Sequence, residues 1–295
     1  MRIGAVLPTT EIGADTAAVR SWAVAVERAG FDAVVVYDHV VGAEHRDRTP
    51  PITRDYDETT PFREPFVLLG HLAALTSTVE LMTGVLVLPQ RQTALVAKQA
   101  AEVALLSGGR FTLGVGIGWN VVEYDALGVG FAERGRRLDE QVELLRRLWS
   151  DGLVSADGRF HRFERVALSP RPDEPVPLVF GGGSEAALSR AVRAGDGFLF
   201  NAPSPAALAL HATLPEQLAG RDPGGFRVLL QVHACHGAEQ LRRSLDPWRD
   251  RKVDDVVVST MRNRMIGADV EVCDGADEHL DLLDRARAVV REVLG

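Results

Sequence analysis

The sequence contains very little of what stabilises small secreted or metal-bound proteins. Two cysteines occur among 295 residues, Cys235 and Cys273, with no Cys-x-x-Cys motif and no cluster of Cys and His. We therefore expect a reduced, cytoplasmic protein without a metal site. No apolar run approaches the roughly 20 residues of a membrane-spanning helix. The residues after Met1 lead directly into a strand pattern rather than a signal peptide.

Lysine is also scarce, since Lys98 and Lys252 are the only two and the other 31 basic residues are arginine. The net charge of −8 argues against nucleic acid or an anionic membrane as a partner and leaves a small-molecule substrate. The sequence has no His-Glu-x-x-His, Gly-x-Ser-x-Gly or Walker motif, and its acidic residues form no evident acid–base pair. A site without its own nucleophile or metal suggests that a bound cofactor supplies the chemistry.

What the sequence does contain is a regular alternation of apolar strand patterns and helical patterns. The strand patterns cover residues 2–7, 33–37, 79–88, 111–115, 176–180, 197–200, 226–232 and 256–259. Uninterrupted apolar strands indicate burial on both faces, hence a parallel sheet covered by helices. Eight such units favour an α/β fold of the (β/α)8 TIM-barrel type, one domain over residues 1–295. The alternative, a doubly wound sheet, needs a Gly-x-Gly-x-x-Gly turn after the first strand, where Leu7-Pro8-Thr9-Thr10 stands instead.

Two insertions interrupt the alternation. Residues 40–65 are polar and proline-rich, and a loop of this length is typical of a functional lid, so we expect it to cover the substrate. Residues 151–175 contain Asp157-Gly158, which suggests a hairpin. The helical patterns lie at residues 16–29, 65–76, 92–107, 133–149, 185–194, 205–218, 238–249 and 277–294.

In a barrel the active site is built from the carboxyl ends of the strands. These ends carry Asp38-His39, Gly84-Val85, residues 116–120, residues 181–184, Asn201, His233 and Ser259. A histidine in this position, His39, can act as acid or base, and Asp38 can orient a ligand or tune a pKa. The alternative for His39 is a hydrogen bond to a loop carbonyl.

The glycine-rich ends suggest contacts with a cofactor and its phosphate. The run Gly109 to Asn120 ends in alternating glycines, which let a ligand approach the backbone. The run Gly181-Gly182-Gly183-Ser184 opens a helix, whose N–H groups suit an anion, although Glu185 in the first turn works against one. Trp119 offers a flat wall to a substrate, or packs in the core. The candidate substrate contacts are Trp119, Asn120, Asn201 and His233.

Short motifs are spread along nearly the whole chain. They are Tyr37-Asp38-His39, Ala97-Lys98-Gln99, residues 106–110, residues 113–119, Glu123, residues 126–128, Phe131, Arg134, residues 138–140, residues 181–184 and residues 194–197. In these motifs the chain resembles the bacterial luciferase-like monooxygenase superfamily, and within it the oxidoreductases that use the deazaflavin coenzyme F420.

The resemblance implies a (β/α)8 barrel with loop insertions at the C-terminal face, and a homodimer. It implies that Asp38 contacts the deazaflavin ring and that Gly84-Val85 is a non-prolyl cis peptide against that ring. It also implies that backbone N–H groups of Ile117-Gly118 and Gly182-Gly183 bind the cofactor phosphate. The candidate cofactor-binding residues are Asp38, Gly84, Val85, Gly116, Ile117, Gly118, Gly182, Gly183 and Ser184.

The chain departs from the sugar-phosphate dehydrogenases of this branch at two positions. In those relatives a histidine matching His39 works with a glutamate where this chain has Trp119. The relatives also have a lysine after the strand that begins at Gly195-Asp196-Gly197, and this chain has Asn201-Ala202-Pro203 in that region instead. Glucose-6-phosphate is therefore not the expected substrate. We expect hydride transfer between F420 and a small organic molecule, with His39 and Asp38 catalytic, and favour reduction of a C=C or C=N bond. The alternatives are an FMN-dependent monooxygenase using O2 and a non-catalytic ligand-binding barrel.

Overall fold

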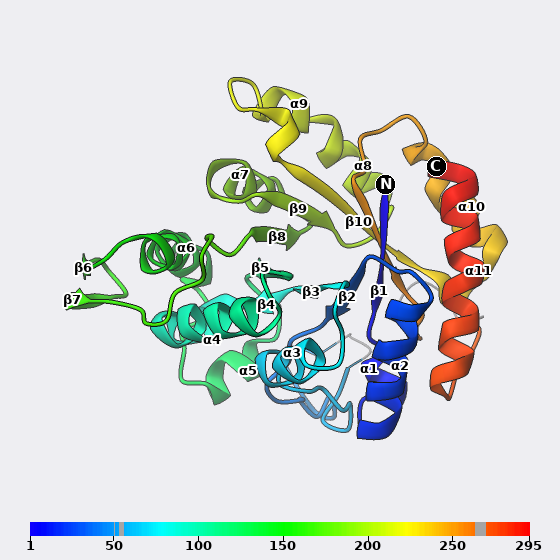
Figure 1. Ribbon diagram of the computed structural model, residues 1–295, viewed down its shortest axis with the longest axis horizontal. Helices are drawn as coiled ribbons and strands as arrows, with labels where there is room; N and C mark the ends of the chain where they lie inside the picture. The colour runs from blue at the N-terminus through cyan, green and yellow to red at the C-terminus, as the bar shows by residue number, and fades with distance from the viewer. Residues whose placement is uncertain (50, 53–55, 263–269) are drawn as a thin grey trace.

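The computed structural model describes residues 1–49, 51–52, 56–262 and 270–295. Its centre is a closed parallel barrel of eight strands, as the sequence predicts (Figure 1). The neighbours run in the order β3-β2-β1-β11-β10-β9-β8-β5, and pairing of β3 with β5 closes the ring. The strands are β1 Arg2–Val6, β2 Ala33–Val36, β3 Glu80–Thr83, β4 Leu86–Val87, β5 Phe111–Gly116, β8 Leu178–Gly182, β9 Gly197–Phe200, β10 Arg227–His233 and β11 Asp255–Ser259.

Helices cover the outside of the barrel, and α11 packs beside α2 (Figure 1). They are α1 Thr9–Ile12, α2 Thr16–Arg28, α3 Pro65–Ala73, α4 Thr93–Leu106, α5 Val121–Ala126, α6 Arg134–Ser150, α7 Glu185–Ala194, α8 Pro205–Ala212, α9 Leu214–Gln217, α10 Ala238–Leu245 and α11 Ala276–Leu294. Short 3-10 helices occupy Leu88–Gln90, Pro223–Gly225, Ala234–His236 and Asp246–Trp248. None of the helices in this described part of the chain combines the length and apolar character needed to cross a membrane.

Several elements differ from the sequence prediction. The strand predicted for residues 79–88 is broken by a cis Gly84–Val85 peptide into β3 and β4, and the cis bond itself is as the resemblance implied. The helix predicted for residues 205–218 divides at Thr213, because Pro215 can begin a helix but cannot continue one. Helices α1 and α5 were not predicted.

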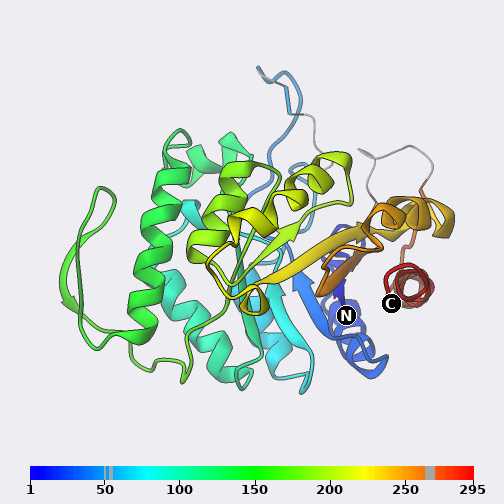
Figure 2. The same ribbon diagram turned by 90° about the horizontal axis from the view of Figure 1, so that it is seen from above.

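The predicted hairpin around Asp157-Gly158 is present as β6 Val154–Asp157 and β7 Arg162–Val166. Both views show it projecting beyond α6, away from the barrel (Figures 1 and 2). Its turn is held by Glu140 of α6, whose carboxylate accepts the backbone N–H of Phe160 at 3.1 Å and contacts His161 Nδ1 at 2.7 Å. The hairpin is therefore anchored at its tip although its strands are exposed.

Side chains alternate along each strand between the barrel interior and the helix layer. Val34 and Val36 of β2 belong to the large core under the helices, whereas Val35 faces inward. The inward cluster comprises Val6, Val35, Met82, Val179, Leu199, Leu229, Val257 and Met261. Continuing the same alternation by two residues places Tyr37, Gly181 and Gln231 in the next layer toward the carboxyl ends. That layer supports the candidate site.

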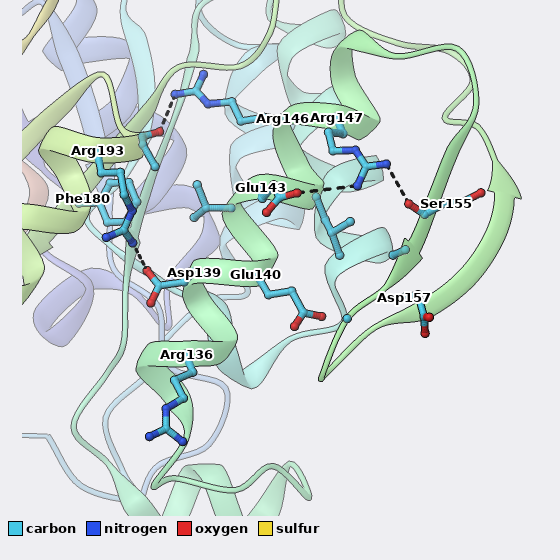
Figure 3. Close-up of a pocket in the computed structure, with 15 residues that line it drawn as sticks. Arg136, Asp139, Glu140, Glu143, Arg146, Arg147, Ser155, Asp157, Phe180 and Arg193 are labelled. Atoms are coloured by element: carbon cyan, nitrogen blue, oxygen red, sulfur yellow. Dashed lines mark hydrogen bonds and ion pairs between the residues drawn. The ribbon is translucent and has the colours of Figure 1, made fainter. Parts of the chain in front are cut away.

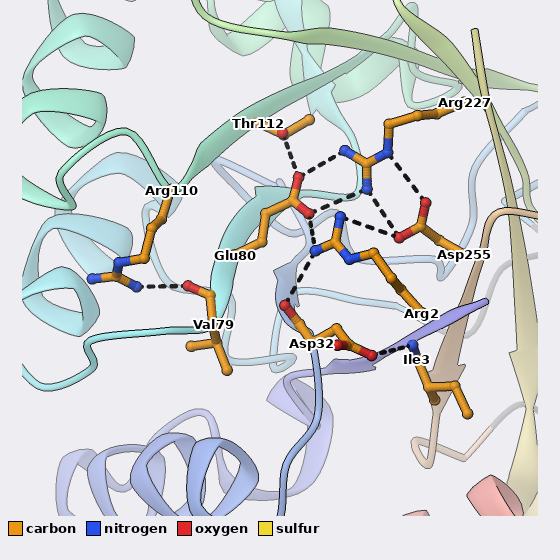
Figure 4. Close-up of polar contacts among 9 residues, drawn as sticks. All are labelled: Arg2, Ile3, Asp32, Val79, Glu80, Arg110, Thr112, Arg227 and Asp255. Carbon is orange, nitrogen blue, oxygen red and sulfur yellow. Dashed lines mark hydrogen bonds and ion pairs between the residues drawn. The ribbon is translucent and has the colours of Figure 1, made fainter. Parts of the chain in front are cut away.

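The amino-terminal end of the barrel is closed by interlocked charges (Figure 4). Arg227 donates to both oxygens of Glu80, at 2.9 and 3.1 Å, and to Asp255 at 3.0 Å. Arg2 and Thr112 donate to Glu80 as well. Burial works to raise the pKa of Glu80, but the hydrogen bonds and charge of Arg227 outweigh it and the pKa is lowered. We call this cluster of paired charges the ionic plug. The candidate site residues lie at the opposite end of the barrel.

Candidate functional site

At the carboxyl end of β2 a histidine is paired with a buried carboxylate. His39 follows the strand, and its Nδ1 lies 3.2 Å from Oε2 of Glu123 on α5. Glu123 has 1% of its side chain exposed and also accepts from Gln90 Nε2 at 3.2 Å and from the Val40 N–H. Burial works to raise the pKa of Glu123, but hydrogen bonding and charge from His39, with the Val40 N–H, lower it overall. Glu123 therefore stays ionised and fixes Nδ1 of His39.

Asp38 points the other way and is an anchor in this structure. Its side chain has no exposed surface, and its oxygens accept from Arg91 Nη2 at 2.7 Å and from the Val87 N–H at 2.8 Å. Burial raises the pKa of Asp38, against the opposing effect of Arg91. Arg91 also pairs with Glu64 at 3.0 Å. Asp38 thus ties β4 and Arg91 to β2, and its contact with a cofactor ring stays a prediction.

Val85 lies over the middle of the barrel mouth. We use the name Val85 floor for Val85 together with the two glycines that contact it, Gly116 and Gly181. A Cβ on Gly116 would lie 2.6 Å from one methyl of Val85, and a Cβ on Gly181 would lie 2.7 Å from the other. Only glycine therefore lets Val85 settle between β5 and β8. Gly84 and Val85 are both partly exposed. A flat apolar surface at this place fits one face of a ring system.

Polar side chains border the Val85 floor on the side of β10 and β11. The pKa of Tyr37 is raised by burial, against hydrogen bonding from Ser259 and Gln231, so its hydroxyl stays protonated. The Gln231 amide lies 3.5 Å from His233 Nε2. Burial, then the charge of His236, lowers the pKa of His233 to about 4, so this imidazole is neutral at physiological pH. These groups offer donors and acceptors without net charge.

Two predicted contacts border the same floor. Asn201 Oδ1 lies near Gly181, within 3.8 Å of where a Cβ there would be, and the Asn201 backbone is hydrogen-bonded with His233. The structure thus brings Asn201 and His233 together, as their shared position at strand ends predicted. Their role as substrate contacts stays a prediction.

The glycines at the end of β8 form an open turn in front of α7. A Cβ on Gly183 would meet no atom within 4 Å, and both Gly183 and Ser184 are exposed. Ser184 caps α7 through its Oγ, which accepts from the Ala187 N–H at 3.3 Å. The N–H groups of the first turn that precede Ala187 point out of the helix. This turn can receive a phosphate, although the Ser184 hydroxyl is already used as a cap.

Four rings form what we call the aromatic cluster, made of His39, Tyr56, Phe62 and Trp119. The His39 ring centroid lies 4.6 Å from that of Phe62, 5.6 Å from that of Tyr56 and 5.7 Å from that of Trp119. All contacts are edge-on, and Tyr56 and Phe62 come from the loop predicted to cover the substrate. The predicted wall of Trp119 therefore lies at His39.

Two expectations need correction. Asn120 was predicted to contact substrate, but it is buried and its Oδ1 caps α5 by accepting from the Val122 N–H at 3.1 Å. No acid–base pair was evident in the sequence, whereas Glu123 lies against His39. Tyr37 and Gln231 were not predicted as site residues. Strand alternation could have identified them, because each stands two residues before a predicted site histidine and therefore faces the same side of its strand.

A hollow of about 810 Å³ lies elsewhere, between α6 and the hairpin (Figure 3). Its charges neutralise one another, as Arg193 pairs with Asp139 at 2.6 Å and Arg147 with Glu143 at 3.9 Å. It contains neither the floor nor the histidine of the barrel mouth. Within the described ranges no group of three or more His, Cys, Asp or Glu side chains is placed to hold a metal ion.

The chain is similar to several known proteins. An uncharacterised protein of Mycobacterium tuberculosis is 34% identical over 256 residues, 84% of this chain and 86% of that protein. An F420-dependent glucose-6-phosphate dehydrogenase of Segniliparus rotundus is 33% identical over 239 residues, 77% of this chain and 65% of that enzyme. The pyrimidine monooxygenase RutA of Enterobacter cloacae is 31% identical over 72% of this chain and 62% of its own length.

Two solved structures share the fold. The monooxygenase RslO1 from Streptomyces bottropensis has a TM-score of 0.74 at 19% identity, covering 100% of this chain and 98% of that one. An F420-dependent secondary alcohol dehydrogenase has a TM-score of 0.66 at 22% identity, covering 97% and 83%. The family model for luciferase-like monooxygenases matches residues 1–276. The chain therefore belongs to the luciferase-like monooxygenase family of oxidoreductases and monooxygenases.

Proposed function

We propose that the protein is an oxidoreductase that transfers a hydride between the deazaflavin coenzyme F420 and a small organic substrate, reducing a C=C or C=N bond. The observation that carries this proposal is the His39–Glu123 pair, which lies at the same end of the barrel as the Val85 floor. It combines a fixed proton carrier with a surface for a ring. The F420-dependent relative supports the choice of cofactor.

The residues fit a deazaflavin. The Val85 floor suits one face of its tricyclic ring, because Gly116 and Gly181 leave room for both methyl groups of Val85 between β5 and β8. Tyr37 and Gln231 offer a hydroxyl and an amide to the polar edge of the ring. The turn at Gly182-Gly183 can bind the phosphate. When bound in its reduced form, F420 supplies a hydride.

His39 would supply the proton that accompanies the hydride. Glu123 holds Nδ1, so Nε2 on the opposite edge of the ring is the atom that can carry the exchangeable proton. The ionised Glu123 holds Nδ1 and so fixes the orientation of the imidazole, and the rings of Phe62 and Trp119 pack edge-on against it. This arrangement is that of a general acid oriented by a second residue.

A monooxygenase that uses reduced FMN and O2 is the second candidate, favoured by the 31% identity with a pyrimidine monooxygenase. The same Val85 floor accommodates an isoalloxazine ring. A deazaflavin does not form the oxygen adduct that a flavin forms, so dependence on O2 separates the two functions.

The first test is a fluorescence titration of the purified protein with F420, beside FMN. Tight, saturable binding of F420 with weaker binding of FMN supports the proposal. Preference for FMN, together with O2 consumption in the presence of reduced FMN, would contradict the proposal and support the monooxygenase function instead. Binding of neither cofactor would revive the non-catalytic barrel. His39→Ala should keep cofactor affinity but lose most turnover.

A further inference from the structure

The aromatic cluster forms one wall beside the His39 imidazole. Phe62 and Trp119 approach the imidazole from different elements, one from the loop after β2 and the other from the end of β5. Tyr56 packs against Phe62 with a centroid distance of 4.9 Å. The rings of His39, Tyr56, Phe62 and Trp119 are each partly exposed, so they are accessible to a ligand rather than sealed in the core.

Apolar side chains extend this wall. Val40 and Val41 follow His39 directly and remain 43% and 41% exposed. Their backbone N–H groups are turned inward to Glu123, which leaves the side chains outward. Exposed valines next to partly exposed rings offer a ligand apolar area and little hydrogen bonding.

Among the described residues, the two charged groups that hold Asp38 and His39 in place, Arg91 and Glu123, are already paired. Glu123 is enclosed by its four donors, and its side chain is 1% exposed. Arg91 is 13% exposed and is held between Asp38 and Glu64. An anionic or cationic substrate would lose hydration beside these two groups without gaining an unpaired charge from either of them, which is costly. A flat, uncharged molecule loses little hydration and gains contact with ring faces.

We propose that the aromatic cluster binds a planar, uncharged substrate whose reducible double bond is conjugated, such as an aryl enone, and that Phe62 and Trp119 determine this specificity. The inference rests on the proposed function, because it concerns the substrate side of the same site. It concerns binding, however, and can be measured without turnover.

The test is isothermal titration calorimetry on the full-length protein, with and without saturating F420. Three probes of graded charge are compared: benzylideneacetone, which is a flat neutral enone, glucose-6-phosphate, and phenyltrimethylammonium. We expect benzylideneacetone to bind at least about 10-fold more tightly than either charged probe. Phe62→Leu and Trp119→Leu should each weaken it by roughly 3- to 10-fold, the size of a lost aromatic pair. Trp119→Phe should recover most of the loss.

Phe160→Leu is the matched control, since Phe160 lies in the hairpin turn on α6 and not at the barrel mouth. Tighter or equal binding of glucose-6-phosphate or of the cation would overturn the proposal. So would the absence of enone binding to F420-loaded protein up to the solubility limit, or equal effects of Phe62→Leu and Phe160→Leu. Enone binding that depends on Phe62 in a protein that does not bind F420 would instead refute the proposed function while leaving the site assignment intact.

Discussion

Replacing Glu123 by glutamine is the sharpest perturbation of the site. The amide has the size of the carboxylate but carries one acceptor oxygen and one donor NH2. The groups that hydrogen-bond with the Glu123 carboxylate all act as donors to it: the N–H groups of Val40 and Val41, the Gln90 amide and Nδ1 of His39. If the amide oxygen serves the N–H groups of Val40 and Val41, the new NH2 faces Nδ1 of His39 and the Gln90 amide, both of which would have to change from donor to acceptor. Glu123→Gln should lose at least one hydrogen bond to a charged acceptor and release the His39 ring.

The magnitude follows from burial. A hydrogen bond to a charged group contributes about 1.5–3 kcal/mol, and Glu123 and His39 are 1% and 12% exposed, so solvent screens little of it. We expect the free energy of unfolding to fall by about 2 kcal/mol, which lowers Tm by roughly 3 °C in a chain of 295 residues. General acid catalysis contributes about 10²–10⁴-fold, so a misdirected His39 should reduce kcat by about 10- to 100-fold at unchanged F420 affinity.

The pH dependence gives an independent signature. The pKa of Glu123 is lowered in the folded protein, so its contribution to stability is fully present above the unfolded value of 4.5 and is lost as the pH falls. The difference in Tm between wild type and Glu123→Gln should therefore be largest at neutral pH and shrink below that value. Scanning calorimetry and turnover are the assays, with the exposed Glu143→Gln on α6 as control. A Glu123→Gln protein with wild-type Tm and kcat would refute the reasoning.

Other regions give further expectations. Glu80→Ala should leave Arg227 short of a partner and lower the free energy of unfolding by about 3 kcal/mol, measured in urea; a change within error would contradict the ionic plug. Gly116→Ala should push its Cβ against Val85 and weaken F420 binding, with Val85→Ala restoring it; unaltered binding would remove the floor from the site. His161→Ala should make the hairpin turn more susceptible to trypsin without changing kcat, whereas unchanged cleavage would mean that the contact with α6 does not hold the hairpin.

The barrel could be predicted because its strands are continuous apolar runs, and burial on both faces is a strong constraint on such segments. The break at Gly84–Val85 could not be derived in the same way, because residues 79–88 are apolar on both sides of it. Helix α5 could not be predicted because its six residues are too few to show a helical period, and it directly follows the glycine run. Local signals therefore identified the elements but missed the places where tertiary contacts bend the chain.

The site could be predicted in part. Strand ends led to His39, Asn201 and His233, which the structure places at the barrel mouth. The partners of these residues depend on which way side chains turn, and this is decided by elements far away in the sequence. Asp38 and His39 are adjacent, yet one faces Arg91 and the other Glu123.

Glu123 shows how a local rule can conceal a residue of the candidate site. Asn120-x-x-Glu123 has the spacing of a capping box, in which the acidic side chain returns to the N–H of the capping residue. Asn120 does cap α5, with Oδ1 accepting from Val122 and Glu123. The Glu123 side chain instead leaves its own helix and binds His39 and the backbone that follows it. Helix α5 therefore lacks the second hydrogen bond of a capping box, and the Glu123 carboxylate is buried against His39 instead. Departures from local consistency concentrate at functional sites, so we attribute this one to the contact with His39.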